Sequence, residues 1–585
     1  MGKIIVLATP VFFLLIAIEF AWGWWRARRG TGRNTYQLDD AISSISLGAL
    51  SQLSAVLLPL LTIGIYSAVQ SKLSLVPAAQ AEAFWNSWYG WLLALVFYDF
   101  CYYWLHRMSH ESALLWAAHV VHHQSQRYNL STALRQPGTD LLLGWIFYLP
   151  LAVAGVPPVL FGIVALVDLL YQFWVHTEQI GKLGWFDRWF CSPSNHRVHH
   201  AVNDGYLDKN YGGILILWDR LFGSFKEEGE PCVYGTRSPL DSWDPLWANA
   251  EVYCSLLKDS WHAKRWADKV RIWFKPPGWR PADVAARFPR PAFDIRRVQT
   301  FQPAASRAVQ WFAAMQFVAL LPCVSAFLWF SDSLPPAHLA VWLAALACGF
   351  WAMGAVLQGR LGMLEVLLVE AAALGAATGA LELLDWHRLF KPLPMVFAIV
   401  LVAARTHSSG ARGRFDACLM LALAASLAGD VFLMFEGYFM PGLMAFLLAQ
   451  LFYLALFKQG VAWLPSRPAL ALTMGMGALM YAFLWTHGLP AELRAPVAVY
   501  VVAIALMAAQ ALGRAGVLHD QAATQVAIGA CVFMLSDALL AFNRFVQPLP
   551  MAALWVLSSY YLAQVLMVRY ARATGSVEPS GDKQV

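Results

Sequence analysis

The chain has 585 residues and a formal net charge of +6; 59% of its residues are hydrophobic and only 13% are charged. Soluble domains carry about 25% charged residues, so this composition excludes a soluble protein and indicates a polytopic membrane protein of at least two domains. The eight cysteines show no CxxC spacing, which argues against both a thiolate metal site and a disulfide framework.

Five hydrophobic stretches in the first half approach the roughly 20 residues that a membrane-spanning helix needs. They cover residues 4–25, 41–69, 88–105, 141–156 and 159–175. The second stretch is long enough for one tilted span or for a helical hairpin. The first ends in Trp-Trp-Arg-Ala-Arg-Arg without a small-residue cleavage site, which favours an uncleaved anchor with cytoplasmic arginines over a secretory signal.

A polar segment rich in Pro, Trp and Arg follows from His176 to about Val298. Eighteen of the 42 lysines and arginines lie between Lys182 and Arg297. A basic segment beside a membrane is typical of the cytoplasmic side facing anionic headgroups, and this explains the charge better than nucleic-acid binding does. Beyond about Gln310 hydrophobic runs return, and they predict eight to ten further helices.

Nine of the fifteen histidines are grouped at helical spacing: HX3H, HX2HH, a single histidine and HX2HH. They are His106, His110, His119, His122, His123, His176, His196, His199 and His200. Each cluster is predicted to aim two or three imidazoles at one point. Eight or nine imidazoles are too many for one ion, so we predict two metal ions. Zinc is the alternative to iron, but a hydrolytic zinc site takes three protein ligands and leaves most of these histidines unused.

Three other features near the histidines are candidates for function. Glu111 directly follows a predicted ligand, and we expect it to act in catalysis, either by anchoring a ligand or by donating a proton. Asp99 lies two helical turns before His106, where it can orient a ligand imidazole or cap a helix. The segment Tyr128–Gln136 is interpreted as a substrate or cofactor loop.

The histidine pattern among membrane helices resembles the fatty acid hydroxylase/sterol desaturase superfamily. The flanking segments are most similar to alkylglycerol monooxygenases: residues 106–111, 128–136, 171–178, 208–212 and 218–223. The resemblance covers about residues 40–290. It implies two iron ions and an O2-dependent hydroxylation of the carbon next to the ether oxygen of an alkylglycerol, which releases a fatty aldehyde. It also implies tetrahydrobiopterin as the electron donor.

Two carboxylates lie inside apolar runs of the second half. Asp430 follows Gly429, and Asp537 follows Ser536. A carboxylate at membrane depth costs several kcal/mol unless it is paired, protonated or hydrated, so both are predicted to be functional. The alternatives are a hydrogen bond between packed helices and the proton relay of a transporter.

The segments around these carboxylates resemble the YhhN-like lysoplasmalogenases. They are residues 391–395, 429–430, 449–453, 535–537 and 560–564. The resemblance implies hydrolysis of the vinyl ether of a lysoplasmalogen, with Asp430 and Asp537 as a catalytic pair. One acid would protonate the alkene, while the other carboxylate would stabilise the cation and activate water, as in glycosidases. Gln450 stands where the family commonly has a histidine, which puts an acid–base role of that position in doubt.

These features predict an all-α polytopic membrane enzyme that degrades ether lipids. We expect a di-iron hydroxylase domain at residues 1–300, further membrane helices at 301–359, a lysoplasmalogenase bundle of about eight helices at 360–572 and a polar tail at 573–585. The expected partners are O2, the lipid substrates and the membrane, and the expected location is a bacterial inner membrane with the histidines on the cytoplasmic side. The alternatives are a sterol desaturase or fatty acyl hydroxylase with a non-catalytic membrane domain, and a metal-dependent transporter or sensor.

Overall fold

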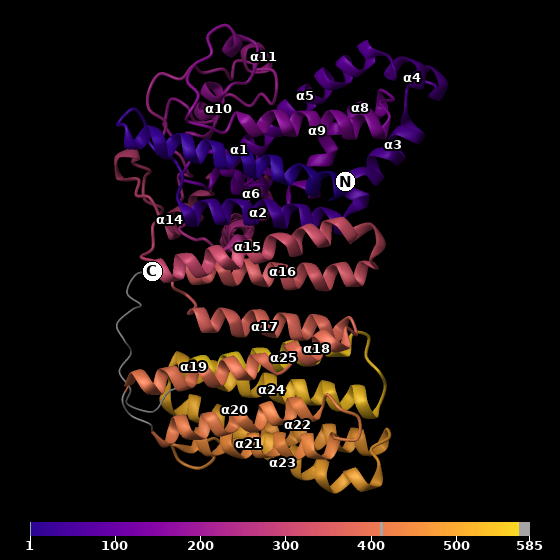
Figure 1. Ribbon diagram of the computed structural model, residues 1–585, viewed down its shortest axis with the longest axis vertical. Coiled ribbons are helices and arrows are strands. Elements are labelled where there is room, and N and C mark those ends of the chain that lie inside the picture. Colours follow the sequence, from indigo (N-terminus) through magenta and orange to yellow (C-terminus); the bar gives the residue numbers. More distant parts are fainter. Residues whose placement is uncertain (1, 410–412, 572–585) are drawn as a thin grey trace. The chain divides into compact units, whose positions relative to one another are not determined.

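The computed structural model describes residues 2–409 and 413–571, and helices make up its regular structure throughout these ranges (Figure 1). The chain divides into two compact units, Met1–Arg360 and Leu361–Val585. Twelve of the described helices are long and apolar enough to cross a membrane, which agrees with the predicted polytopic all-α architecture. The predicted polar tail at 573–585 lies outside the described residues.

The helices of the first unit vary widely in length. Its long helices are α1 (Gly2–Arg28), α2 (Leu38–Leu57), α5 (Trp88–Glu111), α9 (Pro158–Trp174), α12 (Pro245–His262), α15 (Arg307–Phe330) and α16 (Pro336–Leu357). Its shorter helices are α3 (Ile65–Leu73), α4 (Ala78–Trp85), α6 (Ala113–His123), α7 (Leu130–Ala133), α8 (Leu149–Val153), α10 (Pro193–His200), α11 (Leu217–Leu221), α13 (Trp266–Phe274) and α14 (Ala282–Arg287).

Two predicted spans of this unit differ from the structure. The stretch 41–69 is not one tilted helix, because α2 ends just before Pro59, and a π-helical turn at Leu60–Gly64 precedes α3. Proline lacks the backbone N–H that a continuous helix needs at this position. The stretch 141–156 forms only short helical turns, and its apolar part, Gly144–Val153, would extend about 15 Å, half of a bilayer core.

Several helices of the first unit pack against α5 and α6, which carry five of the nine histidines. Helix α5 packs against α6 and α9, and α6 also packs against α12. Helices α15 and α16 lie side by side and both contact α2 (Figure 1). The segment expected as additional helices at 301–359 therefore packs within the first unit.

The second unit is a helical bundle. Its helices are α17 (Met363–Ala380), α18 (Leu384–Phe390), α19 (Leu393–Ser409), α20 (Arg414–Phe432), α21 (Phe439–Lys458), α22 (Arg467–Thr486), α23 (Ala491–Leu518), α24 (Gln521–Phe545) and α25 (Ala552–Tyr570). Eight candidate membrane spans lie in this unit, with α18 and α19 counted as one, as the sequence predicts. Sequence neighbours pack as antiparallel pairs, notably α20 with α21 and α24 with α25.

Small residues next to the two carboxylates bring their helices close to neighbouring helices. A Cβ atom on Gly429 would lie 2.6 Å from the ring of Phe446 on the adjacent helix α21. The hydroxyl of Ser536 donates a hydrogen bond to the backbone oxygen of Val556 on α25 at 2.8 Å. Asp430 and Asp537 therefore sit where their helices are in close contact with others.

Candidate metal centre and buried carboxylate site

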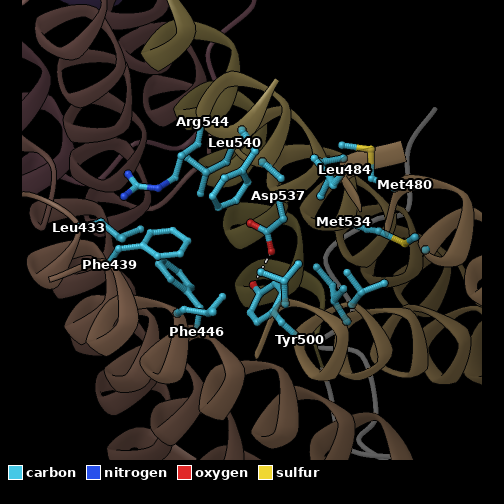
Figure 2. A pocket seen from close by; sticks show the side chains of 18 residues that line it. Leu433, Phe439, Phe446, Met480, Leu484, Tyr500, Met534, Asp537, Leu540 and Arg544 are labelled. Carbon is cyan, nitrogen blue, oxygen red and sulfur yellow. Dashed lines mark hydrogen bonds between the residues drawn. The ribbon is translucent and has the colours of Figure 1, made fainter. Parts of the chain in front are cut away.

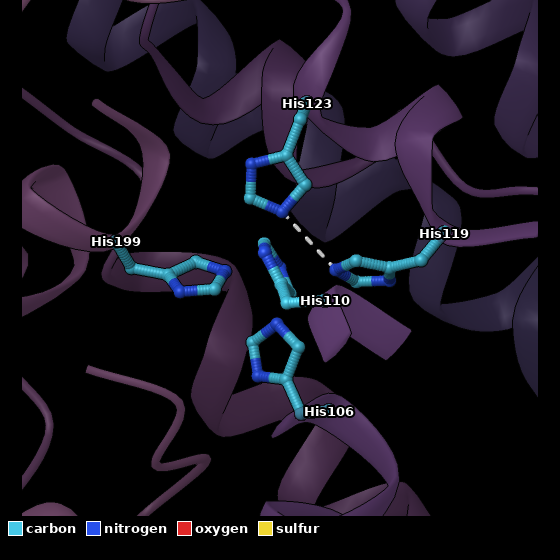
Figure 3. Close-up of side chains that lie close together, drawn as sticks. All are labelled: His106, His110, His119, His123 and His199. Atoms are coloured by element: carbon cyan, nitrogen blue, oxygen red, sulfur yellow. Dashed lines mark hydrogen bonds between the residues drawn. The ribbon is translucent and has the colours of Figure 1, made fainter. Parts of the chain in front are cut away.

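The structure gathers all nine predicted histidines into two groups. Within each group, one ligand nitrogen per ring lies within 4.8 Å of the others. The first group holds His106, His110, His119, His123 and His199 (Figure 3). The second group holds His122, His176, His196 and His200. Eight of these residues are buried and His119 is half-buried, so the rings converge inside the protein.

Each HX2HH segment divides its histidines between the two groups, whereas the sequence predicted one target for each cluster. His122 joins the second group, while its neighbour His123 joins the first. Consecutive helical residues point about 100° apart, so adjacent rings diverge. In both segments the rings four positions apart share a group and those three positions apart do not. His119 and His123 accordingly meet, with Nε2 atoms 3.1 Å apart, and so do His196 and His200 on α10, at 3.2 Å.

Backbone carbonyl groups orient four of the rings through their Nδ1 atoms. The pairs are His106 with Tyr211 (2.8 Å), His122 with Arg135 (2.9 Å), His176 with Gln172 (2.7 Å) and His199 with Lys209 (3.0 Å). A carbonyl oxygen only accepts hydrogen bonds, so each of these Nδ1 atoms carries the proton. The Nε2 atom then has a free lone pair, the form in which histidine binds a metal.

The arrangement of the free nitrogens fits a bound cation. His122 and His176 place two Nε2 lone pairs 3.1 Å apart, which is repulsive unless a positive ion lies between them. In the first group the Nε2 atoms of His106, His110 and His199 are buried and have no hydrogen-bond partner among the described residues. Buried polar atoms normally have partners, and a metal ion is the partner that suits several converging imidazoles.

Burial also keeps the rings in their metal-binding form. Desolvation lowers the pKa of His122 to about 4 and the pKa of His200 well below its usual value. These two rings are therefore neutral at pH 7 without a metal, and each can offer a lone pair. The donor set is nitrogen-rich and matches iron binding.

Carboxylates hold the loops that carry these carbonyl groups. Asp219 is fully buried and accepts hydrogen bonds from the backbone N–H groups of Tyr211 (2.8 Å) and Gly212 (2.7 Å). It thereby fixes the Tyr211 carbonyl that orients His106. Asp99 accepts hydrogen bonds from the N–H groups of Ile214 and Leu215. Asp99 thus neither caps its own helix nor contacts an imidazole, in contrast to both sequence-based alternatives, because its position on α5 faces this loop.

Glu111 lies away from both histidine groups. Its carboxylate accepts a hydrogen bond from Arg107 at 2.8 Å, one helical turn back, and its side chain is 43% exposed. Glu111 thus forms an ion pair at the surface and makes no hydrogen bond to a histidine nitrogen among the described residues. Its catalytic role remains a prediction that the geometry does not support.

The segment Tyr128–Gln136 has two functions in the structure. The Arg135 carbonyl orients His122, and the ring of Tyr128 lies 5.2 Å from that of His200. Leu134 and Gln136 line a cavity. The segment therefore both orients a histidine of the candidate metal centre and forms part of the wall of the cavity.

A cavity of about 340 Å³ in the first unit reaches both histidine groups. His106 and His119 of the first group line it, as do His122 and His176 of the second. Aliphatic and aromatic residues of α1, α2 and α15 form much of its wall. An apolar cavity with a few polar groups at one place is the usual form of a small-molecule site.

Three polar residues on the cavity wall were not predicted from the sequence. The Tyr102 hydroxyl donates to the side-chain oxygen of Gln172 at 2.7 Å, and Gln172 donates to Asp168 at 2.5 Å. Asp168 is buried, and its second oxygen has no hydrogen-bond partner among the described residues. Asp168 could have been predicted from the sequence, because it is a carboxylate inside an apolar helix, as Asp430 and Asp537 are.

A second cavity, of about 100 Å³, lies in the bundle of the second unit (Figure 2). Asp537 lines it and accepts a hydrogen bond from Tyr500, which lines it too. Asp430 accepts a hydrogen bond from Tyr560 at 2.8 Å, and the Tyr560 ring packs against Phe446 of the cavity wall. The two carboxylates interact electrostatically, so the structure brings the predicted pair into one region.

Two further polar residues lie beside this pair. Lys391 is buried and interacts electrostatically with Asp430. The amide nitrogen of Gln450 lies 3.4 Å from the Tyr500 hydroxyl, and its side-chain oxygen is buried without a hydrogen-bond partner among the described residues. Gln450 therefore borders the site even though it does not titrate.

Fold and site together define a helical membrane protein with a buried polyhistidine centre in one unit and paired intramembrane carboxylates in the other. The fatty acid hydroxylase family model matches residues 91–224, and the YhhN family model matches residues 386–571. The chain belongs to the alkylglycerol monooxygenase family in its N-terminal part and carries a lysoplasmalogenase-related YhhN domain in its C-terminal part.

Curated relatives cover both parts. Alkylglycerol monooxygenase of Homo sapiens is 36% identical over 315 residues, which are 54% of this chain and 68% of that protein. The Danio rerio enzyme of the same name is 36% identical over 331 residues, 55% of this chain and 70% of that protein. Lysoplasmalogenase TMEM86B of Sus scrofa is 35% identical over 192 residues, 33% of this chain and 78% of that protein. No solved structure matches the chain.

Proposed function

We propose that this protein degrades ether lipids with two active sites. The first unit would be an O2-dependent monooxygenase that hydroxylates the carbon next to the ether oxygen of an alkylglycerol. The hydroxylated product is a hemiacetal, which separates into a fatty aldehyde and a glycerol hydroxyl. The observation that most directly supports this proposal is the apolar cavity, whose lining includes histidines of both groups. The family membership of the N-terminal part supports it too.

In this proposal the nine histidines hold two iron ions, which supply the oxygen-activating redox chemistry when they are bound. Tetrahydrobiopterin is the proposed electron donor. The apolar walls formed by α1, α2 and α15 bind the alkyl chain and exclude water from it. His106, His122 and His176 line the cavity, so an ether carbon bound at that end of the cavity would lie next to the centre.

The second unit would hydrolyse the vinyl ether of a lysoplasmalogen. Asp537 lines the cavity and is the group that delivers a proton to the alkene carbon distant from the ether oxygen. Asp430, held by Tyr560, stabilises the resulting cation. Water adds to this cation and gives up a proton to the carboxylate pair, which forms a hemiacetal and restores the acid. The hemiacetal then breaks its ether bond to give a fatty aldehyde and the free glycerol hydroxyl of a glycerophosphodiester, so that one water is consumed per bond broken.

We further propose that the protein resides in a bacterial inner membrane with the histidine centre on the cytoplasmic side. Helix α1 ends in Arg26 and Arg28, and the basic segment from Lys182 to Arg297 contains the third histidine cluster. Lysine and arginine near the ends of membrane spans favour the cytoplasm.

Purified full-length protein tests the monooxygenase proposal. We expect bound iron, and we expect fatty aldehyde from an alkylglycerol only when O2 and tetrahydrobiopterin are both present. Iron is measured by elemental analysis and aldehyde by derivatisation and mass spectrometry. Iron-loaded protein that forms no aldehyde from alkylglycerol but hydroxylates a sterol or a fatty acyl chain would favour the alternative hydroxylases.

A further inference from the structure

The cavity of the second unit has one cationic residue in its wall. Apart from Tyr500, Asp537 and Arg544, the side chains that line it are apolar. The guanidinium of Arg544 lies 4.1 Å from the centre of the Phe439 ring and 6.0 Å from that of Phe545, and both rings also line the cavity. Arg544 is exposed and has no carboxylate partner among the described residues.

Arg544 and Asp537 lie on the same face of one helix. They are seven positions apart on α24 (Gln521–Phe545), which is about two turns and about 10 Å along the axis. Arg544 is exposed and next to the end of the helix, whereas Asp537 is half-buried and lies two turns before it; Figure 2 shows both side chains on the cavity wall. The site therefore has an exposed cation, an acid two turns further into the bundle and apolar walls around them.

This order matches the order of groups along a lysophospholipid. Such a molecule carries a phosphate, then a three-carbon glycerol backbone, then the ether and its hydrocarbon chain. The guanidinium of arginine forms paired, charge-assisted hydrogen bonds with phosphate oxygens, and stacking on aromatic rings leaves its N–H edge available. With the phosphate at Arg544, the glycerol backbone and the flexible arginine side chain span the spacing to Asp537.

We propose that Arg544 binds the headgroup phosphate of the substrate and thereby makes the second site selective for phosphorylated over unphosphorylated 1-alkenylglycerols. The inference rests on the vinyl-ether hydrolase function proposed above. A purely structural role is the alternative, because an arginine in the last turn also stabilises a helix C-terminus. A structural role predicts no discrimination between substrates with and without phosphate.

The test compares Arg544→Gln with wild type in the full-length protein, using 1-alkenyl-glycerophosphoethanolamine and 1-alkenylglycerol. We expect wild type to prefer the phosphorylated lipid. Arg544→Gln should raise KM for it at least about tenfold, the loss expected for a charge-assisted contact, and leave KM for 1-alkenylglycerol unchanged. Arg494→Gln is the matched control, because Arg494 also lies over an aromatic ring, Trp485, at 4.0 Å but does not line the cavity.

Two outcomes would overturn the assignment: an unchanged preference in Arg544→Gln, or an equal loss with both lipids. Binding of the uncleavable 1-alkyl-glycerophosphoethanolamine, measured as the shift in melting temperature, provides a readout independent of turnover. Arg544→Gln should reduce this shift relative to wild type, while the shift with 1-alkylglycerol stays the same. If wild type cleaves neither alkenyl lipid, the proposed hydrolase function fails, and the binding comparison still decides the role of Arg544.

Discussion

The adjacent residues His122 and His123 belong to different histidine groups, so single substitutions can test whether each group binds its own metal ion. His122→Ala removes one of the four nitrogens of the second group, and His123→Ala removes one of the five of the first. We expect each variant to retain iron in the intact group and to lose it from the other, so that the double variant loses more than either one. Iron per chain after dialysis against a weak chelator measures this.

The control for these substitutions is His262→Ala, because His262 belongs to neither group and contacts the Lys258 carbonyl instead. It should retain wild-type iron. If His122→Ala and His123→Ala each lose all the iron that the double variant loses, the nine rings form one indivisible site and the two-ion proposal is wrong.

Asp219 supports the centre without being a ligand. Asp219→Ala removes the acceptor for the N–H groups of Tyr211 and Gly212, so the carbonyl that orients His106 is no longer fixed. Loss of such a supporting contact typically weakens metal binding about 10- to 100-fold, and chelator competition measures the change. Asp204→Ala is the control, since its ion pair with Arg237 is at the surface and contributes little. Equal iron affinity in both variants would contradict a positioning role for Asp219.

Residue types and spacing were sufficient to find all nine histidines, because nothing else explains so many imidazoles at helical intervals. His122 and His123 belong to different groups because adjacent helical residues point about 100° apart. The sequence alone could have predicted this assignment. It could not have predicted the contacts of Asp99, because Asp99 binds backbone N–H groups of Ile214 and Leu215, more than a hundred positions away in the sequence. Such pairings arise from the tertiary fold and leave no periodic pattern in the sequence.

At the scale of the element, the loop after α10 depends on a glycine. A Cβ atom on Gly213 would lie 2.8 Å from Asp168 Oδ1, 2.8 Å from the Tyr102 ring and 2.9 Å from Asp99 Oδ1. Gly213→Ala must therefore push this loop away from α5 and α9, at a cost of about 1–3 kcal/mol. We expect lower thermal stability and weaker iron retention, measured by thermal unfolding and elemental analysis.

Gly181→Ala is the matched control for Gly213→Ala. A Cβ atom on Gly181 would have no atom within 4 Å, so the variant should behave as wild type. Gly213→Ala with unchanged unfolding temperature and iron content would show that the loop tolerates displacement and does not set the geometry of the centre.

Hydrophobic length predicted the elements of the second unit better than those of the first. The bundle helices are continuous apolar runs between short loops, so length alone defines them. In the first unit, α2 ends just before Pro59, and the 141–156 run breaks into short turns. Tyr148 within this run and Asp140 just before it line the cavity. Residues there form part of a cavity wall rather than a lipid-facing helix, and composition does not distinguish these two environments.

At the scale of the whole molecule, two unrelated chemistries share one product. Oxidation of an alkyl ether and hydrolysis of a vinyl ether both release a fatty aldehyde from glycerol. The metal centre lies in the unit Met1–Arg360 and the carboxylate pair in the unit Leu361–Val585. The two sites share no residue, so in the proposed function one chain would act on both saturated and unsaturated ether lipids without a common catalytic group.

Because the two sites are separate, we expect that a substitution in either site of the full-length protein removes one activity and leaves the other. Asp537→Asn removes the proposed proton donor, and we expect vinyl-ether cleavage to fall about 10²- to 10⁴-fold, the usual contribution of general acid catalysis. His122→Ala should abolish aldehyde release from alkylglycerol. Each variant should retain the other activity within about twofold, because effects at sites without shared partners are independent. Aldehyde release is measured from each lipid separately, with and without O2. Loss of both activities in either variant would show that the two units act as one catalytic unit, since O2-independent vinyl-ether cleavage has no other reason to need His122.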